Sequence, residues 1–290
     1  MVTKVLFVGL SYVGDVVMSS TLLVSLNKMY PDAKIDVVAD KRTASMYSSC
    51  PFIGKVYLKD KNKFLRGTPH LLWDLRKNYY DIIVDIRTGF LAYLLKAQKK
   101  YIKKNKQDLS EHAVESLHNV IESIDGISNI PKTKVWFSKE DETFSKKIFS
   151  NIDRSEGKVI ALSVGDPNKP HKNWPAQKYI DLLNDHKQFI KYVIYTGSIH
   201  EKTVNEQIIN SVNIEHANIA GCSLMEAAAV LKHCDIYIGP DSGPGHIAAA
   251  VDTTTISFFS TAKPEHYRPW GNKSFCFLGE NRQAESISLN

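Results

Sequence analysis

Short apolar runs alternate with longer amphipathic stretches from the first residues of the chain onward. The run Lys4–Leu10 is almost wholly apolar, and leucines then repeat at helical spacing between Val16 and Met29. A second apolar run follows at 34–39. Near-continuous apolar strands joined by an amphipathic helix are typical of a parallel sheet that is covered on both faces. The pattern therefore predicts a β-α-β unit at the start of the chain.

This alternation continues through the first half of the chain and restarts in the second. The first half adds strand-like runs at 55–58 and 80–86 and a helix at 111–124 that Ser110 can cap. Beyond the polar stretch 151–158, the pattern predicts strands and helices in turn, at 159–164, 176–185, 192–196, 223–232, 235–239, 246–250 and 254–259. We therefore predict an α/β protein with two Rossmann-like domains, 1–155 and 156–290, whose parallel sheets face a central cleft.

Composition narrows the class of protein. Of the 290 residues, 43% are apolar and 23% are charged, which are ordinary globular values. No apolar run approaches the roughly 20 residues that span a bilayer, and the N-terminus lacks the features of a secretory signal. The four cysteines form neither a CxxC motif nor a zinc-binding spacing. We expect a reduced, cytoplasmic protein.

The net charge of +6 is unevenly distributed along the chain. Residues 1–150 hold 24 Lys and Arg against 16 Asp and Glu, a formal charge of +8. Residues 151–290 hold 13 against 15, a formal charge of −2. A basic first half predicts an anionic partner for that half. The alternative is a solvated lysine-rich surface without a specific partner.

The first loop with candidate chemistry follows the first predicted strand. Gly9 and Gly14 are five positions apart, which does not match the GxGxxG motif of dinucleotide-binding proteins. Asp15 stands at the start of the next helix, where a carboxylate would repel a pyrophosphate but could accept a proton from a hydroxyl group. The alternative is that Asp15 serves as the N-cap of that helix.

A second candidate loop follows the strand predicted at 159–164. Ser163 and Gly165 offer backbone amides there, and Lys172 precedes a Trp174-Pro175 pair at a predicted helix start. A lysine near a helix N-terminus can place a positive charge on a phosphate group. The alternative is a surface lysine beside a packing tryptophan.

The most informative loop is Asp241-Ser242-Gly243-Pro244-Gly245-His246, between an apolar strand and a helix of small residues. Backbone N–H groups at such a helix start suit a diphosphate, and Ser242 and His246 can add hydrogen bonds. A Ser-His-Asp hydrolase is excluded because the GxSxG elbow is missing. The alternative is a plain Gly/Pro-rich connector.

In their order and spacing these motifs resemble glycosyltransferase family 9, the ADP-heptose:lipopolysaccharide heptosyltransferases. The resemblance extends over nearly the whole chain, although the acceptor-binding segment of the first domain matches only loosely. The matching motifs are Gly14–Val17, Pro31–Asp36, Tyr80–Asp85, Lys172–Pro175, Ala220–Leu224, Gly239–Ala250 and Pro264–Gly271.

The resemblance implies a GT-B fold that transfers a sugar with inversion, with the acceptor on the N-terminal domain and the donor on the C-terminal domain. It implies that Asp15 is the general base and that Lys172 neutralises the departing diphosphate. Donor binding is then expected from Ser163, Gly165, Lys172, Glu201, Cys222, Asp241, Ser242, Gly243 and His246. Acceptor binding is expected from Ser11, Gly14 and Arg87.

The resemblance also implies the partners. The co-substrate would be a nucleotide sugar, ADP-heptose, with no other cofactor, and the acceptor a lipid-linked anionic oligosaccharide, the lipid A-Kdo core. We expect a monomer that contacts the cytoplasmic face of the inner membrane peripherally. The lysine run 99–104 is a candidate contact or simply a solvated face. Because the chain has no DxD pair, we expect no metal requirement.

Other functions remain open at this point. They are a GT-B transferase that uses another nucleotide sugar for a different surface glycan, a sugar-nucleotide epimerase, and an inactive nucleotide-sugar-binding protein. A dehydrogenase is excluded by the missing GxGxxG motif. Nucleic-acid binding has only the positive charge in its favour, and no recognition motif supports it.

Overall fold

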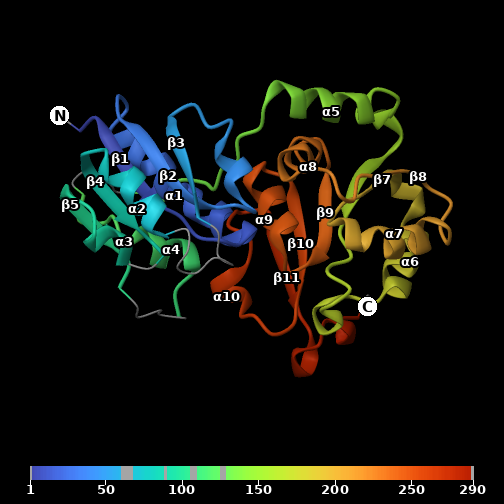
Figure 1. The fold of residues 1–290 in the computed structure, drawn as a ribbon. Helices are drawn as coiled ribbons and strands as arrows, with labels where there is room; N and C mark the ends of the chain where they lie inside the picture. Colours follow the sequence, from blue (N-terminus) through green and yellow to red (C-terminus); the bar gives the residue numbers. More distant parts are fainter. Residues whose placement is uncertain (1, 60–67, 88–89, 105–109, 125–128, 289–290) are drawn as a thin grey trace. The chain divides into compact units, whose positions relative to one another are not determined.

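The chain forms two compact units, Met1–Trp136 and Phe137–Asn290 (Figure 1). They are seen in a computed structural model that describes residues 2–59, 68–87, 90–104, 110–124 and 129–288. Both units are built on parallel sheets, so the predicted α/β class is confirmed. Among the described residues, no helix has the length and apolar character needed to cross a bilayer.

The first unit contains a five-stranded parallel sheet in the order β3-β2-β1-β4-β5. Its strands are β1 (Lys4–Val8), β2 (Lys34–Asp40), β3 (Ile53–Lys59), β4 (Tyr80–Asp85) and β5 (Ala97–Ile102). Its helices are α1 (Val13–Met29), α2 (Thr68–Arg76), α3 (Phe90–Tyr93) and α4 (Ala113–His118), with a 3₁₀ turn η1 (Ala44–Tyr47). The central strands are almost fully buried, as their apolar sequences predict.

The second unit contains a six-stranded parallel sheet in the order β11-β10-β9-β6-β7-β8. Its strands are β6 (Lys158–Leu162), β7 (Ile190–Tyr195), β8 (Glu215–Asn218), β9 (Ile236–Pro240), β10 (Thr254–Phe259) and β11 (Ser274–Leu278). Its helices are α5 (Lys139–Phe149), α6 (Ala176–Asp185), α7 (Lys202–Ile209), α8 (Leu224–Leu231), α9 (Gly243–Ala250) and α10 (Pro264–Tyr267). Its 3₁₀ turns are η2 (Arg154–Glu156), η3 (Pro170–Lys172), η4 (Lys187–Phe189), η5 (Ile199–Glu201), η6 (Glu280–Arg282) and η7 (Ala284–Ser286).

The strand order fixes where each unit can bind a ligand. In both sheets the chain starts in the middle, builds outward on one side and then crosses to the other. The direction reverses between β1 and β4 in the first unit and between β6 and β9 in the second. Ligands of doubly wound sheets bind at this switch point, beyond the carboxyl ends of the strands. The loops after these four strands are therefore the candidate site loops.

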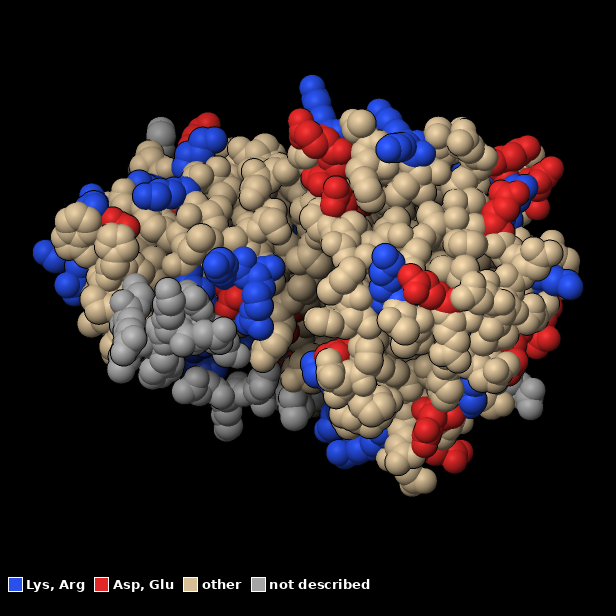
Figure 2. Space-filling view, turned by 45° about the vertical axis from the view of Figure 1, so that its right-hand side comes forward, with Lys and Arg blue, Asp and Glu red and all other residues tan. Residues whose placement is uncertain are grey.

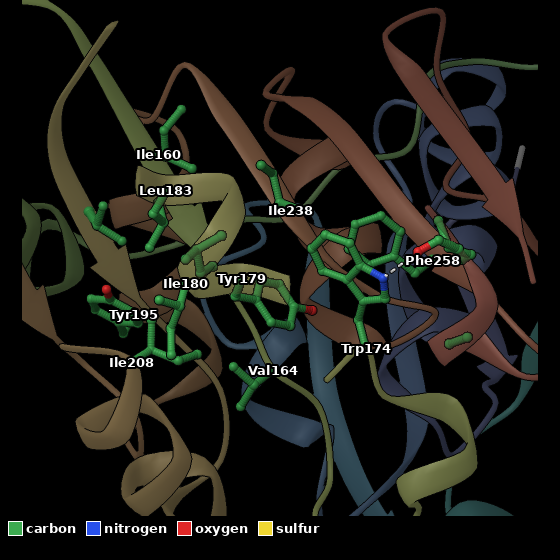
Figure 3. Close-up of a cluster of buried hydrophobic side chains, with 14 residues drawn as sticks. Ile160, Val164, Trp174, Tyr179, Ile180, Leu183, Tyr195, Ile208, Ile238 and Phe258 are labelled. Carbon is green, nitrogen blue, oxygen red and sulfur yellow. Dashed lines mark hydrogen bonds between the residues drawn. The ribbon is translucent and has the colours of Figure 1, made fainter. Parts of the chain in front are cut away.

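An aromatic cluster fixes the loop after β6 in the second unit (Figure 3). The indole ring of Trp174 packs on Phe258 and Tyr179, at centroid distances of 4.5 and 5.0 Å. Its Nε1 donates a hydrogen bond to the carbonyl oxygen of Ile287 at 3.1 Å. Burial of a large aromatic side chain contributes several kcal/mol to stability, on the order of 3–5 by truncation to alanine. This anchor holds the preceding segment, which includes Lys172, against the sheet.

The helix predicted at 111–124 is shorter in the structure. The regular helix α4 spans only Ala113–His118. Its N-cap is His112, not Ser110, and the ring of His112 accepts a hydrogen bond from the backbone N–H of Val114 at 3.1 Å. Ile121 and Ile124 are still buried, but they lie in turns. Apolar spacing alone therefore overestimated the length of the helix.

The units divide 19 residues before the predicted boundary at 155/156. Helix α5, which lies within the range predicted for the first domain, packs against α8 in the second unit (Figure 1). The buried hydroxyl of Ser145 donates a hydrogen bond to the carbonyl oxygen of Ala229 at 3.0 Å. The polar stretch 151–158 is thus a connection within the second unit, and the predicted boundary was wrong.

Candidate active site

Asp15 lies in the first turn of α1, at the switch point of the first sheet. The N-cap of this helix is Tyr12, in an extended conformation and without a side-chain capping bond. Asp15 is therefore not the N-cap, and the capping alternative is wrong. Gly14 precedes it in the same turn, and both residues are half-buried.

Burial is the main influence on the pKa of Asp15. Loss of hydration raises the pKa of its carboxyl group above the ordinary value, and the positive charge of Lys103 partly offsets that rise. Lys103 follows β5, and its backbone N–H donates to the carbonyl oxygen of Asp85 at 2.9 Å. A partly buried carboxylate with a raised pKa is suited to accept a proton from a hydroxyl group.

Two of the predicted acceptor-binding residues, Ser11 and Arg87, meet on Asp40 at the end of β2. Ser11 is buried, and its hydroxyl bonds to the carboxylate of Asp40. The guanidinium of Arg87 lies 4.0 Å from the same carboxylate. Arg42 binds Asp40 with two donors, at 2.9 and 3.2 Å, and holds its pKa at about 2. Asp40 is therefore a buried carboxylate around which Ser11 and Arg87 are oriented.

Arg87 retains an unused donor. Its side chain is 12% exposed, and its Nη1 atom is buried without a hydrogen-bond partner among the described residues. Its backbone N–H donates to the carboxylate of the fully buried Asp85 at 3.0 Å. An unsatisfied buried donor costs free energy, so an anion that accepts from Nη1 would be favoured.

In the second unit, Glu201 holds the loop after β6. One of its carboxylate oxygens accepts from the hydroxyl of Ser163 at 3.0 Å and from the backbone N–H of Gly165 at 2.9 Å. Its other oxygen accepts from the backbone N–H of Ser198 at 2.8 Å. Glu201 is buried, with only 6% of its surface exposed, so its observed role is to fix this loop. Its direct contact with a donor stays a prediction.

Gly165 is required by the packing of the loop. Its φ is +86°, in the region that favours glycine. A Cβ atom at this position would collide with the side chains of Asn173 and Pro240. The amide of Asn173 in turn donates to the carbonyl oxygen of Asp166 at 2.8 Å. The loop after β6 is therefore packed closely against the end of β9 at Gly165.

Lys172 and Asp241 form an ion pair between the loops after β6 and β9. The ammonium nitrogen of Lys172 lies 3.8 Å from a carboxylate oxygen of Asp241, and the side chains are 32% and 17% exposed. Lys172 is therefore not an isolated surface lysine. It lies next to the loop that begins α9, within the group of residues predicted to bind the diphosphate.

The start of α9 brings together Ser242, Gly243 and His246. Ser242 is the N-cap, but its side chain makes no capping bond. Its Oγ is buried without a partner of standard geometry among the described residues. Gly243 begins the helix, and His246 is 5% exposed one turn later. Backbone N–H groups and a serine hydroxyl at a helix N-terminus are suited to an anion.

Cys222 lies at a separate loop of the same unit. It follows Gly221, whose φ is +93°, and directly precedes the N-cap of α8. The thiol is half-buried, and burial raises its pKa to about 12. The thiol is therefore uncharged at neutral pH and is not activated as a nucleophile. This state is compatible with the predicted part of Cys222 in donor binding.

Several supporting residues were not identified from the sequence. Tyr179 donates from its hydroxyl to the carbonyl oxygen of Ser163 at 3.1 Å. The buried hydroxyl of Tyr237 lies beside Ser163 and Ser242, which partly offset the rise in its pKa caused by burial. Asp40 and Lys103 play the corresponding part in the first unit. For Asp40 and Lys103 the available signal was their position at the ends of β2 and β5. The contacts that these four residues make cannot be read from the sequence.

Across the described ranges, no group of three or more His, Cys, Asp or Glu side chains could hold a metal ion. The four cysteines are unpaired. The predicted independence of metal remains a prediction.

The two doubly wound parallel units give this chain the fold of the GT-B-type glycosyltransferases. The family model "Glycosyltransferase family 9 (heptosyltransferase)" matches residues 85–288. The chain therefore belongs to glycosyltransferase family 9, as the motifs predicted.

Characterised relatives and solved structures agree with this assignment. The chain is 26% identical to "Lipopolysaccharide heptosyltransferase 3" of Escherichia coli, over 93% of this chain and 87% of the relative. It is 25% identical to "Lipopolysaccharide core heptosyltransferase OpsX" of Haemophilus influenzae, over 91% and 80%. The family 9 glycosyltransferase structure from Veillonella parvula superposes with a TM-score of 0.84 at 18% identity, covering 99% of this chain and 94% of that one. Heptosyltransferase II of E. coli superposes with a TM-score of 0.76 at 21% identity, covering 99% and 95%.

Proposed function

We propose that this protein transfers a heptosyl group from ADP-heptose to the anionic inner core of lipopolysaccharide, with inversion at the anomeric carbon. Membership of the heptosyltransferase family and relatives named as lipopolysaccharide heptosyltransferases support this proposal. The acceptor is the lipid A-Kdo core, bound by the first unit, and the donor is bound by the second. The protein works as a monomer at the cytoplasmic face of the inner membrane.

The observation that carries the proposal is the half-buried carboxyl group of Asp15 at the switch point of the first sheet. The hydroxyl oxygen of the acceptor attacks the anomeric carbon of the donor, and Asp15 takes the proton of that hydroxyl. The bond between that carbon and the β-phosphate oxygen breaks, and its electron pair leaves with ADP. A carboxylate whose pKa is raised by burial is a stronger base for this step than an exposed one.

The second unit stabilises the leaving group. Negative charge develops on the diphosphate as the glycosidic bond breaks, and fixed donors placed there lower the barrier. Lys172 supplies a positive charge, and the start of α9 supplies backbone N–H groups and the hydroxyl of Ser242. Bound diphosphate would also compete with Asp241 for Lys172. These groups replace the divalent cation that other glycosyltransferases use, so chelation should leave the rate unchanged.

Replacement of Asp15 tests this mechanism. Asp15→Asn should lower the rate of transfer by roughly 10³-fold, because the base is lost while the shape is kept. Affinity for ADP should change little, since Asp15 belongs to the first unit. The melting temperature at neutral pH should hold or rise, because an ionised carboxylate with a raised pKa is unfavourable when buried. Near-normal transfer by this variant would exclude Asp15 as the base.

A nucleotide panel tests the donor. Calorimetry with ADP, UDP and GDP should show the tightest binding for ADP, and mass spectrometry should detect one added heptose on a core acceptor. Preference for UDP would favour a transferase with another nucleotide sugar. Turnover of the nucleotide sugar without an acceptor would indicate an epimerase. Binding of ADP without any transfer would indicate an inactive binding protein.

A further inference from the structure

The first unit exposes aromatic and basic side chains on one surface, around the end of α2, α3 and the start of β5. The aromatic side chains of Trp73, Tyr79 and Tyr93 are 60%, 58% and 72% exposed. Single exposed aromatics are ordinary, but three on neighbouring segments that also carry several cations are not. We call this surface the basic aromatic face; its members are Trp73, Arg76, Lys77, Tyr79, Tyr93 and Lys96.

Two kinds of contact tie together the elements that carry this face. The ammonium of Lys77 lies 3.3 Å from the ring centroid of Trp73. The guanidinium of Arg76 donates two hydrogen bonds, at 3.1 and 3.2 Å, to the carbonyl oxygen of Leu94, the residue after Tyr93. These bonds join the end of α2 to the segment that leads into β5. In Figure 1, α2, α3 and β5 accordingly lie together in the first unit.

A hollow opens in the middle of this face. Its volume is about 580 Å³, and it is lined by Arg76, Lys77, Asn78, Tyr79, Leu94 and Lys96. Three of these six residues are cations and none is acidic. The neighbouring carboxylate, Asp74, is already bound by Lys77 at 2.8 Å. The hollow is therefore positively charged and large enough for a phosphate-bearing head group.

The surroundings of the face are basic as well. Residues 1–136 hold 21 Lys and Arg against 13 Asp and Glu, so the first unit carries a formal charge of +8. Lys99 and Lys100 are exposed on β5, at the edge of the sheet. In the part of Figure 2 that shows the first unit, basic side chains predominate over acidic ones.

We propose that the basic aromatic face docks the protein on a bilayer that contains anionic phospholipids, with a lipid phosphate group in the hollow. Cations within a Debye length of an anionic bilayer are attracted to it. Tryptophan and tyrosine favour the zone between head groups and hydrocarbon, because their rings are apolar and their edges polar. The face combines both features, which a site for a water-soluble anion would not need.

This inference rests on the proposed function only in the choice of membrane, since a lipid-linked acceptor requires the enzyme to reach a bilayer. The members of the face precede β4 and β5 or lie on α2 and α3. None of them belongs to the predicted catalytic or binding residues. Docking and sugar transfer can therefore be tested separately.

Vesicle flotation of the full-length protein tests docking without any substrate. Vesicles of phosphatidylcholine with phosphatidylglycerol should carry the protein, and vesicles of phosphatidylcholine alone should carry far less. Raising the salt concentration should weaken binding, as screening requires. Equal binding to both kinds of vesicle, or binding to neither, would overturn the proposal.

Paired variants locate the surface. Lys96→Gln with Tyr93→Ser should lower the partition coefficient on anionic vesicles by about tenfold, of which the charge accounts for about fivefold. Lys187→Gln with Phe189→Ser is the matched control, because it removes one exposed lysine and one exposed aromatic from the second unit. It should bind as the unaltered chain does. Equal loss in both variants would overturn the location.

Two further measurements separate other outcomes. Transfer to an acceptor fragment without acyl chains should be unchanged in the Lys96/Tyr93 variant. If neither the unaltered chain nor any variant transferred a sugar to that fragment, the result would count against the proposed function alone. Analytical ultracentrifugation should show the same mass for both variants and the unaltered chain. If the unaltered chain were a dimer and only the Lys96/Tyr93 variant were a monomer, the face would join two copies, and the membrane proposal would fail.

Discussion

Asp15 is held between two opposing influences, and the balance sets the pH range in which it can act. Burial disfavours its charged form, while the charge of Lys103 favours it. The pKa of Lys103 is itself lowered by burial and raised by Asp15. A general base acts only when deprotonated, so the rate should fall on the acid side as pH drops through the raised pKa of Asp15.

Lys103→Met should shift this acid limb. Loss of the positive charge removes a charge effect that lowers the pKa of Asp15, so the pKa rises further. The acid limb of the pH profile of kcat/KM should move to higher pH, while the plateau above it changes little. Lys104→Met is the control, since Lys104 is the exposed neighbour in sequence. An unshifted limb in Lys103→Met would show that the two groups are not coupled.

Glu201→Gln should loosen the donor loop. The glutamine side chain keeps one oxygen that can accept hydrogen bonds. Its NH₂ group, however, must face a hydroxyl or backbone N–H group that donates to the carboxylate in the unaltered protein. We expect a loss of about 1–3 kcal/mol of stability and a higher KM for the donor, with a smaller effect on kcat. Glu226→Gln is the matched control, because Glu226 closes the capping box of α8 without holding this loop. Similar donor KM values in the two variants would contradict the positioning role of Glu201.

At the scale of elements, the sequence predicted the helices and strands whose buried faces are marked by apolar residues. The bounds of α6 and β10 match the predicted ranges, because apolar residues there follow one clear period. Polar elements were missed. β8 is Glu-His-Ala-Asn, which has no pattern that separates it from a loop, and α7 has only three apolar residues at helical spacing, Val204, Ile208 and Ile209. Tertiary contacts, not local preference, decide such segments.

The candidate site was predictable to a similar extent. The loops after β1, β6 and β9 stood out because glycine, serine and charged residues follow apolar strands. The partners that organise them did not stand out. Asp40, at the end of β2, meets Ser11 and Arg87 only because β2 and β4 flank β1 in the sheet. Likewise, the place of Glu201 beneath the loop after β6 depends on the register of neighbouring strands.

Replacement of Gly165 should disturb the conformation of the whole loop after β6. Gly165→Ala places a Cβ against Asn173 and Pro240 at a φ of +86°. We expect a loss of roughly 2–4 kcal/mol of stability, and weaker ADP binding, from strain and collision together. Gly271→Ala is the control, because the nearest atom to its Cβ is 3.7 Å away. Unchanged melting temperature and ADP affinity in Gly165→Ala would contradict the close packing of this loop against the end of β9.

At the scale of the whole molecule, charge and architecture coincide. The basic excess lies in the unit that ends at Trp136, and the second unit carries a formal charge of −2. The charge split found in the sequence therefore survives the correction of the boundary, because residues 137–155 carry equal numbers of acidic and basic side chains. That neutrality is also why charge could not locate the boundary.

The position of the boundary itself can be tested with fragments of the second unit. Residues 137–290 include α5, which covers α8 through the Ser145–Ala229 hydrogen bond and the contact of Phe149 with His233 at a centroid distance of 5.5 Å. A fragment of residues 156–290 lacks this helix and exposes that side of α8. If α5 contributes about 2 kcal/mol, the melting temperature of the shorter fragment should be lower by roughly 8 °C. Circular dichroism during heating measures the difference, and calorimetry compares ADP binding. Equal melting temperatures would restore the later boundary, because α5 would then add nothing to the second unit.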